Sequence, residues 1–189
     1  MEQNNTSLQV KKARWVGALF LSAFLLYGIG RNLFESELFN QKCIGAALII
    51  TNSIVVIFIG FFLRKTIIQY NLWAGNAYLF SRVIEAIGLV IIVLNLASSI
   101  SFSLDFGYFV AMLSLGIGSI PMCYIFFKHN VLPKWLAIWG LIGYTFLALG
   151  FLMELFGKEW SMYLLILGGL WELTFSIWLI IKAGTIKTN

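Results

Sequence analysis

The stretch Ser81-Arg82-Val83-Ile84-Glu85-Ala86 places an arginine and a glutamate three residues apart, at the start of an apolar run that continues through Leu94. A charged side chain at the centre of a bilayer costs about 2.5–3.5 kcal/mol, so charges inside apolar spans are rare and have partners. Residues three apart on a helix are neighbours on one face. We therefore expect Arg82 and Glu85 to pair inside a membrane-spanning helix.

The composition of the chain indicates that lipid is the solvent for most of it. Of its 189 residues, 60% are hydrophobic and 11% are charged, whereas a soluble domain has about 25% charged residues. The mean hydropathy is +0.91. The formal net charge of +5 does not indicate nucleic-acid binding, because the basic residues fall in short connections between apolar runs rather than on one face.

The length of the apolar runs predicts the fold class. A bilayer core of about 30 Å needs about 20 helical residues at a rise of 1.5 Å per residue. The chain has six runs of this kind and lacks the alternation that is typical of strands. We predict an all-α membrane protein, with six transmembrane helices in a single domain over residues 13–182. The expected helices cover about residues 13–30, 43–63, 77–96, 108–127, 135–155 and 162–181.

Small residues in the last three of these runs predict close helix packing. Ser114 and Gly118 stand four apart in the fourth run, Gly140 and Gly143 lie in the fifth, and Gly168 lies in the sixth. Small side chains let helix backbones approach closely in lipid.

The Lys and Arg residues in the connections predict the orientation. Nine of the 13 Lys and Arg residues fall on one side of the predicted membrane and three on the other, while Arg82 lies within a run. Because cytoplasmic loops carry an excess of these residues, both termini should be cytoplasmic. The polar residues 1–12 are expected to form a disordered cytoplasmic tail, and residues 183–189 a second cytoplasmic tail.

Polar residues of other runs share the depth of the Arg82–Glu85 pair. Counted from the run centres, Glu172 falls near the midplane of the sixth run and Asn52 near that of the second. Arg82, Glu85, Glu172 and Asn52 therefore form a candidate intramembrane polar cluster. One arginine cannot neutralise two carboxylates, so clustering of the charged groups requires either a protonated glutamate or a bound cation.

The sequence contains no recognisable catalytic, cofactor-binding or metal-binding motif, and we expect no cofactor. It has one histidine and two cysteines, Cys43 and Cys123, which lie in or beside different apolar runs. Zinc sites need closely spaced Cys and His ligands. An intramembrane enzyme acting on a lipid or isoprenoid stays an alternative, but no residue cluster supports it, and a non-enzymatic role is favoured.

Segments of the chain resemble a bacterial integral-membrane family known as domain of unknown function 4386. They are Phe80–Ala86, Val131–Gly143, Trp171-Glu172-Leu173 and Trp178–Gly184. The resemblance extends over nearly the whole chain from the first helix onward, and it is most specific in the third helix and after His129. It implies a small multi-span protein of a bacterial inner (plasma) membrane. It implies no reaction, ligand or cofactor.

Two functional interpretations remain open. The first is transport or permeation of protons, cations or a small solute through the mid-membrane polar layer. The alternative is a non-catalytic membrane accessory, sensor or immunity-type protein, in which the buried Arg/Glu cluster is structural. The expected partners are the lipid bilayer and either a second copy of the chain or another membrane protein, without nucleic acid. A water-accessible cavity at the cluster favours transport, whereas a dry cluster with every group satisfied favours a structural role.

Overall fold

The apolar runs form helices in the computed structural model of the protein, which describes residues 2–97, 104–154, 156 and 160–182. A helix satisfies its backbone hydrogen bonds within one segment, as lipid requires because lipid offers no partners for them. No strand occurs in the described residues. The helices are α1 (Glu2–Phe34), α2 (Phe39–Ile67), α3 (Leu72–Ala97), α4 (Leu104–Lys128), α5 (Lys134–Glu154) and α6 (Ser161–Lys182).

Each predicted run lies within one of these helices, apart from residue 155 at the end of the fifth run, which is outside the described residues. The helices extend past the runs at most ends, because helical hydrogen bonding continues into polar flanks. α1 begins at Glu2, so residues 2–12 are helical where the sequence predicted a disordered tail. This segment has no glycine or proline to interrupt the helix. The predicted tail over residues 183–189 lies outside the described residues.

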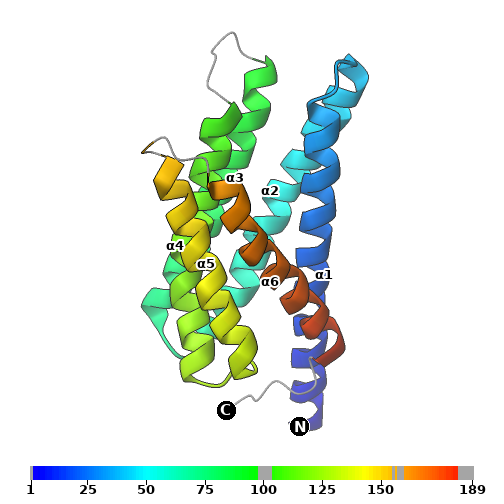
Figure 1. Ribbon diagram of the computed structural model, residues 1–189. Helices are drawn as coiled ribbons and strands as arrows, with labels where there is room; N and C mark the ends of the chain where they lie inside the picture. The colour runs from blue at the N-terminus through cyan, green and yellow to red at the C-terminus, as the bar shows by residue number, and fades with distance from the viewer. Residues whose placement is uncertain (1, 98–103, 155, 157–159, 183–189) are drawn as a thin grey trace.

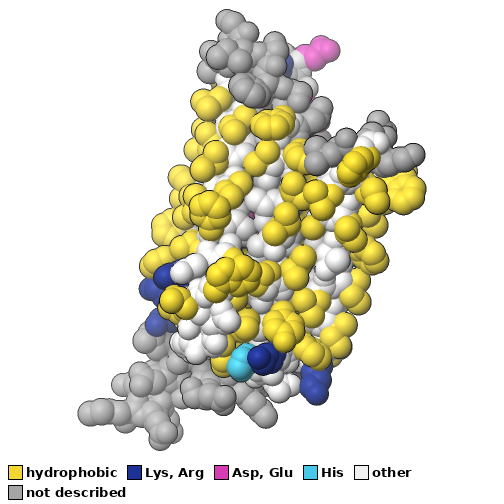
Figure 2. Space-filling model, turned by 90° about the vertical axis from the view of Figure 1, so that its left-hand side faces the viewer, with side chains coloured by type: hydrophobic (Ala, Val, Ile, Leu, Met, Phe, Trp, Pro, Cys, Tyr) yellow, Lys and Arg dark blue, Asp and Glu magenta, His cyan; other side chains and the backbone are white. Residues whose placement is uncertain are grey.

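Each helix in the described part of the chain contains a stretch long and apolar enough to cross a membrane. Large aliphatic side chains are also exposed on every helix, as on a surface that contacts lipid. Figure 2 shows them as a broad hydrophobic surface, with basic side chains gathered toward its lower end. Together these features fit a multi-pass membrane protein. One such exposed residue from each helix, in chain order, is Leu25, Ile54, Ile87, Ile117, Ile142 and Ile177.

The helices form a closed ring in chain order. Each helix packs against its neighbours in the sequence, and α6 returns to pack against α1. Figure 1 shows α6 crossing the front of the bundle obliquely toward the end where α1 begins. Helices across the ring, such as α3 and α6, share little backbone contact in the described residues. Whatever joins them must therefore be side chains that reach into the interior of the ring.

A glycine lies at every seam of this ring, where two neighbouring backbones approach. A side-chain carbon at Gly45 would lie 2.6 Å from the carbonyl oxygen of Gly30, and one at Gly60 would lie 2.8 Å from Cβ of Arg82. Close helix approach in lipid depends on such positions. The absence of a side chain at Gly60 thus sets where Arg82 sits between α2 and α3. The seams pair Gly30 with Gly45, Gly60 with Arg82, Gly88 with Gly107, Gly116 with Ala148, Gly143 with Gly168 and Gly17 with Ser176.

The two ends of the bundle differ in charge. The start of α1 and the end of α6 lie at the same end (Figure 1). Most of the described basic residues outside the bundle interior belong to this end. Arg31 and Lys42 belong to the opposite end, beside the connection between α1 and α2. The basic residues of the first end are Lys11, Lys12, Arg14, Arg64, Lys65, Lys128, Lys134 and Lys182.

Candidate functional site

Arg82 is the centre of a buried cluster of polar side chains. Its side chain is 2% exposed, and each of its nitrogens donates to a different residue. Nε donates to the hydroxyl of Tyr78 at 2.9 Å, and Nη1 donates to Oε2 of Glu85 at 2.8 Å. Nη2 donates to Oε1 of Glu172 at 3.2 Å. The guanidinium is therefore fixed by three partners.

The helical repeat of α3 explains two of these contacts. Tyr78 precedes Arg82 by four residues and Glu85 follows it by three, so all of them lie on one face of the helix. The third partner, Glu172, comes from α6, which lies across the ring from α3. The Arg82 side chain thus bridges two helices whose backbones barely meet.

Glu172 has a second partner on α5. The hydroxyl of Tyr144 donates to the same Oε1 atom at 2.7 Å. Tyr144 is buried, while the side chain of Glu172 is 13% exposed and that of Glu85 is 6% exposed. In the described residues, each of the two carboxylates is hydrogen-bonded through a single oxygen. Each therefore keeps acceptor capacity for a further group.

Aromatic side chains close the cluster on the side nearer the start of α1. The Phe20 ring lies 5.3 Å from Cζ of Arg82, and Phe20 packs edge-on against Phe175. Phe175 in turn stacks on Trp171, whose Nε1 donates to the backbone oxygen of Leu136 at 2.6 Å. Favourable contacts between a guanidinium and aromatic faces help to stabilise the buried charge.

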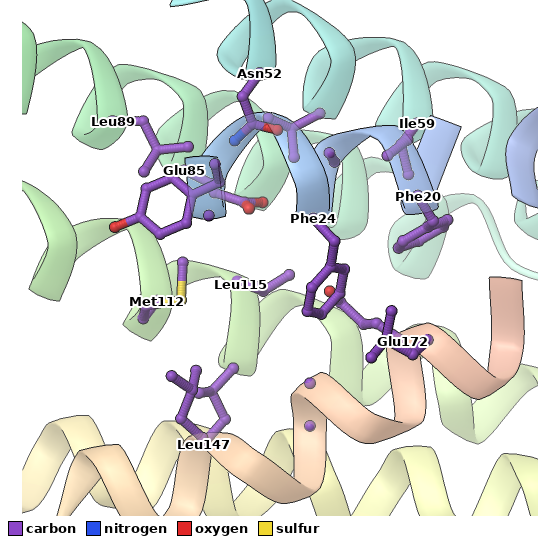
Figure 3. A pocket seen from close by; sticks show the side chains of 18 of the residues that line it. Phe20, Phe24, Asn52, Ile59, Glu85, Leu89, Met112, Leu115, Leu147 and Glu172 are labelled. Carbon is purple, nitrogen blue, oxygen red and sulfur yellow. The ribbon is translucent and has the colours of Figure 1, made fainter. Parts of the chain in front are cut away.

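A cavity of about 450 Å³ adjoins the cluster. Residues from all six described helices line it, and most of its wall is apolar. Figure 3 shows Leu147 and Met112 pointing into it opposite Glu85 and Asn52. Tyr27 of α1 and Tyr108 of α4 also line the cavity and stack with ring centroids 5.9 Å apart. The cavity therefore has a charged floor and hydrophobic walls.

The structure brings together three of the four predicted cluster residues. Arg82, Glu85 and Glu172 are in direct contact. Asn52 of α2 lines the same cavity and is 4% exposed, and it has no hydrogen bond to the other three in the described residues. Its Oδ1 atom is buried and has no hydrogen-bond partner in the part of the chain that the structure describes. A buried, unpaired carbonyl oxygen is unfavourable unless a ligand or water supplies a donor.

The charges of the cluster do not balance. Arg82 carries one positive charge and stays protonated in proteins, whereas Glu85 and Glu172 supply two carboxyl groups. With both carboxylates ionised, the floor of the cavity has one excess negative charge in a low-dielectric setting, where an unpaired charge is costly. A proton, a cation or a positively charged group of a ligand relieves that cost.

Two tyrosines of the cluster were not among the predicted site residues. Tyr78 was detectable in principle, because it stands four residues before Arg82 on the same predicted helix. Tyr144 falls at mid-depth in its span, but its contact with Glu172 depends on how α5 and α6 pack. Phe20 carried no sequence signal beyond its apolar character, since its contact with Arg82 depends on the closure of the ring.

The comparisons with known proteins bear mainly on the second half of the chain. No curated protein and no solved structure matches the chain. The model of the family described as Domain of unknown function (DUF4386) matches residues 103–183. This stretch contains Tyr144 and Glu172 but not Arg82 or Glu85. Over α4 to α6, the chain is therefore similar to DUF4386, which confirms the resemblance expected from its sequence.

Proposed function

We propose that this protein carries protons or cationic solutes across a membrane, with the cavity and its Arg82, Glu85 and Glu172 floor as the binding site. The observation that carries the proposal is the excess carboxylate at the edge of a cavity inside the membrane-spanning region. Ionisable groups within membrane spans commonly mark ion and proton pathways. The unpaired Oδ1 of Asn52 beside the same cavity supports this role, because a purely structural cluster has no use for an unsatisfied acceptor.

A structural role is the second candidate, and one observation favours it. Every nitrogen of Arg82 has a partner, so the guanidinium holds α3 to α6 across the ring. A polar lock of this kind suits a membrane accessory, sensor or immunity-type protein. It accounts for the contacts of the arginine but leaves the excess negative charge and the cavity without a purpose.

The proposal includes an orientation and a membrane. The end of the bundle that holds the start of α1 and the end of α6 faces the cytoplasm, because most of the described Lys and Arg residues belong to it. The resemblance to a bacterial integral-membrane family supports placement in a bacterial plasma membrane. The cluster then lies in the cytoplasmic half of the span, and the cavity extends from it toward the outer side.

Flux measurements on proteoliposomes test the proposal. Proton flux is followed with a trapped pH-sensitive dye under an imposed pH gradient, and cation flux is followed by uptake of radioactive sodium and rubidium. We expect protein-dependent flux of at least one of these ions, with a loss of at least tenfold in Glu172→Gln. The same change at an exposed connection, Glu37→Gln, serves as the control and should leave the flux unchanged.

Two outcomes of this experiment contradict the proposal. One is the absence of proton, sodium and rubidium flux above that of protein-free liposomes. The other is a folded Glu172→Gln protein that retains the flux of the unmodified protein. Thermal melting of each variant in the same lipid establishes that it is folded.

A further inference from the structure

The cavity reaches the molecular surface between α1 and α6. Most of its lining is buried, but Gly28 of α1 and Ile166 and Leu170 of α6 line it and are also exposed. Ile166 is 55% exposed and Leu170 is 49% exposed. A side-chain carbon at Gly28 would lie more than 4 Å from every described atom of the neighbouring helices. These three positions therefore surround an opening in the wall of the ring.

The way α1 and α6 pack explains the opening. They approach closely near the middle of α1, where a side-chain carbon at Gly17 would lie 2.6 Å from the backbone oxygen of Ser176. Phe20 and Phe175 pack one turn further along. Beyond this point α6 runs obliquely toward α5 and away from the upper part of α1 (Figure 1). The two helices are therefore in contact around Gly17 and are separated around Gly28.

The opening faces lipid. Gly28 lies within the apolar span Lys11–Phe34, and Ile166 and Leu170 lie within the apolar span Ser161–Lys182. A molecule that enters here arrives from within the bilayer, so it must itself dissolve in the membrane. The apolar wall formed by residues such as Phe24, Met112 and Leu147 can receive a hydrocarbon body of this kind (Figure 3).

The floor of the cavity specifies the polar end of that molecule. Glu85 and Glu172 line the cavity, and the second oxygen of each carboxylate is a free acceptor, while Tyr27 and Tyr108 add hydroxyl groups to the lining. The excess charge is negative, because one guanidinium faces two carboxylates. An ammonium group supplies both a positive charge and N–H donors, whereas an alcohol lacks the charge and a carboxylate has the wrong sign.

We infer that the cavity binds an amphipathic amine, with a hydrocarbon body and one ammonium group, which enters from the bilayer between α1 and α6. The inference rests on the proposed function, since it names the class of cationic solute that the site accepts. It adds two features to that function: a lateral path through the opening at Gly28 and selectivity for a positively charged group that donates hydrogen bonds.

Photolabelling of the full chain in phosphatidylcholine nanodiscs tests the inference. The probe is decylamine with a diazirine in its alkyl chain, and labelled positions are found by mass spectrometry. We expect labelling of peptides from α1 and α6 that line the cavity. Excess unlabelled decylamine should reduce it at least fivefold, and equal amounts of decanol or decanoate should not. Labelling that all three compounds reduce equally, or that spreads over the exposed faces of all helices, overturns the inference.

Two variants separate the path from the charge. Gly28→Leu adds bulk at the opening without changing charge, and Glu172→Gln removes the excess charge without changing shape. Each should reduce the competable labelling at least fivefold. Leu25→Phe adds bulk on the lipid-facing side of α1 and should label like the unmodified protein. Unchanged labelling of a folded Gly28→Leu or Glu172→Gln protein overturns the corresponding half of the inference. If a variant does not fold, the inference is judged from the positions labelled in the unmodified protein and from the competition by decylamine, decanol and decanoate.

The outcome also distinguishes this inference from the proposed function. Competable labelling in a protein that shows no flux supports the amine site and removes transport as its role. Flux that requires Glu172, in a protein that decylamine does not label, removes the amine site and leaves proton or cation transport in place.

Discussion

At the scale of single residues, Arg82 and Glu172 carry different roles although they form one ion pair. Arg82 is the only cation that contacts the two carboxylates in the described residues. Glu172 is the second of two anions, and it also accepts from Tyr144. Removing the arginine therefore leaves two acids inside the bundle without a cationic partner, whereas neutralising Glu172 leaves the balanced pair of Arg82 and Glu85. The two changes should have unequal effects on stability.

We predict that Arg82→Gln lowers the free energy of unfolding by about 3–5 kcal/mol, the usual cost of breaking a buried ion pair. Glu172→Gln should change it by less than about 1 kcal/mol, because the amide oxygen of the glutamine still accepts from Tyr144 and Arg82. Unfolding by SDS titration in mixed micelles measures both values.

An exposed ion pair provides the control for this comparison. Arg31 and Glu35 are in contact at 2.5 Å, with side chains 26% and 52% exposed. Such pairs contribute about 0–1 kcal/mol, so Arg31→Gln should have little effect. Equal destabilisation by Arg82→Gln and Glu172→Gln would mean that the charged groups act together as a structural lock.

The sequence was informative about the charged residues for simple geometric reasons. A spacing of three residues on one helix predicted the contact of Arg82 with Glu85, and equal depth in the membrane predicted that Glu172 belongs with them. The depth of a residue in the membrane does not say toward which neighbouring helix its side chain points. For this reason the hydrogen bond from Tyr144 and the unpaired oxygen of Asn52 became visible only in the structure.

At the scale of helices, glycine seams hold the ring together. Gly88 of α3 faces Gly107 of α4, and a side-chain carbon at Gly88 would lie 2.6 Å from the Gly107 carbonyl oxygen and 3.0 Å from the backbone nitrogen of Ala111. Both contacts are with backbone, so a side-chain rotation cannot relieve them. The two helices must separate to accommodate even one methyl group.

We predict that Gly88→Ala destabilises the protein by about 1–3 kcal/mol, as overpacking of a tight contact does. Gly28→Ala is the matched change at a position with open space, and it should be neutral or stabilising by up to about 1 kcal/mol through its better helix propensity. Thermal melting in one detergent compares the two. If the Gly88→Ala protein has the same melting temperature as the unmodified protein, α3 and α4 can separate without loss of stability.

The helices themselves were predictable from run length, and the partners at their seams were not. Small residues such as Gly143 and Gly168 indicated close approach, but their pairing follows from the packing of α5 on α6. Short connections make neighbours in sequence into neighbours in space. The return of α6 to α1 depends instead on an oblique crossing that no local pattern encodes.

At the scale of the whole molecule, the cavity results from the unequal closure of the ring. Helices that follow one another in the sequence pack more extensively than α1 and α6, which approach closely at Gly17 and Ser176. The space that remains is lined from all six described helices and is floored by the charges that join α3 to α6. The cavity is formed by segments that are far apart in the chain, so no single segment indicates it. The sequence therefore predicted the polar residues of the site but not the apolar residues that line the cavity.

The orientation of the molecule yields the last prediction, which depends on α2. This helix has 29 residues and is about 44 Å long at 1.5 Å per residue, so Glu37 before it and Gln69 after it lie on opposite sides of a membrane. With the Lys- and Arg-rich end in the cytoplasm, a membrane-impermeant maleimide added to intact cells should label Glu37→Cys at least tenfold more than Gln69→Cys. The exposed Cys43 is replaced by serine in both variants, and the buried Cys123 is kept.

Permeabilised cells, in which both cysteines should react, provide the control for access. Stronger labelling of Gln69→Cys than of Glu37→Cys in intact cells would show that the molecule has the opposite orientation in the membrane. The result also decides which leaflet supplies the cavity, because Gly28 lies nearer the Phe34 end of its span than the Lys11 end. In the predicted orientation the opening between α1 and α6 lies in the outer half of the bilayer, so an amphipathic amine reaches the carboxylates from the outer leaflet. In the inverted orientation the same opening lies in the inner half of the bilayer, so the amine reaches the carboxylates from the inner leaflet.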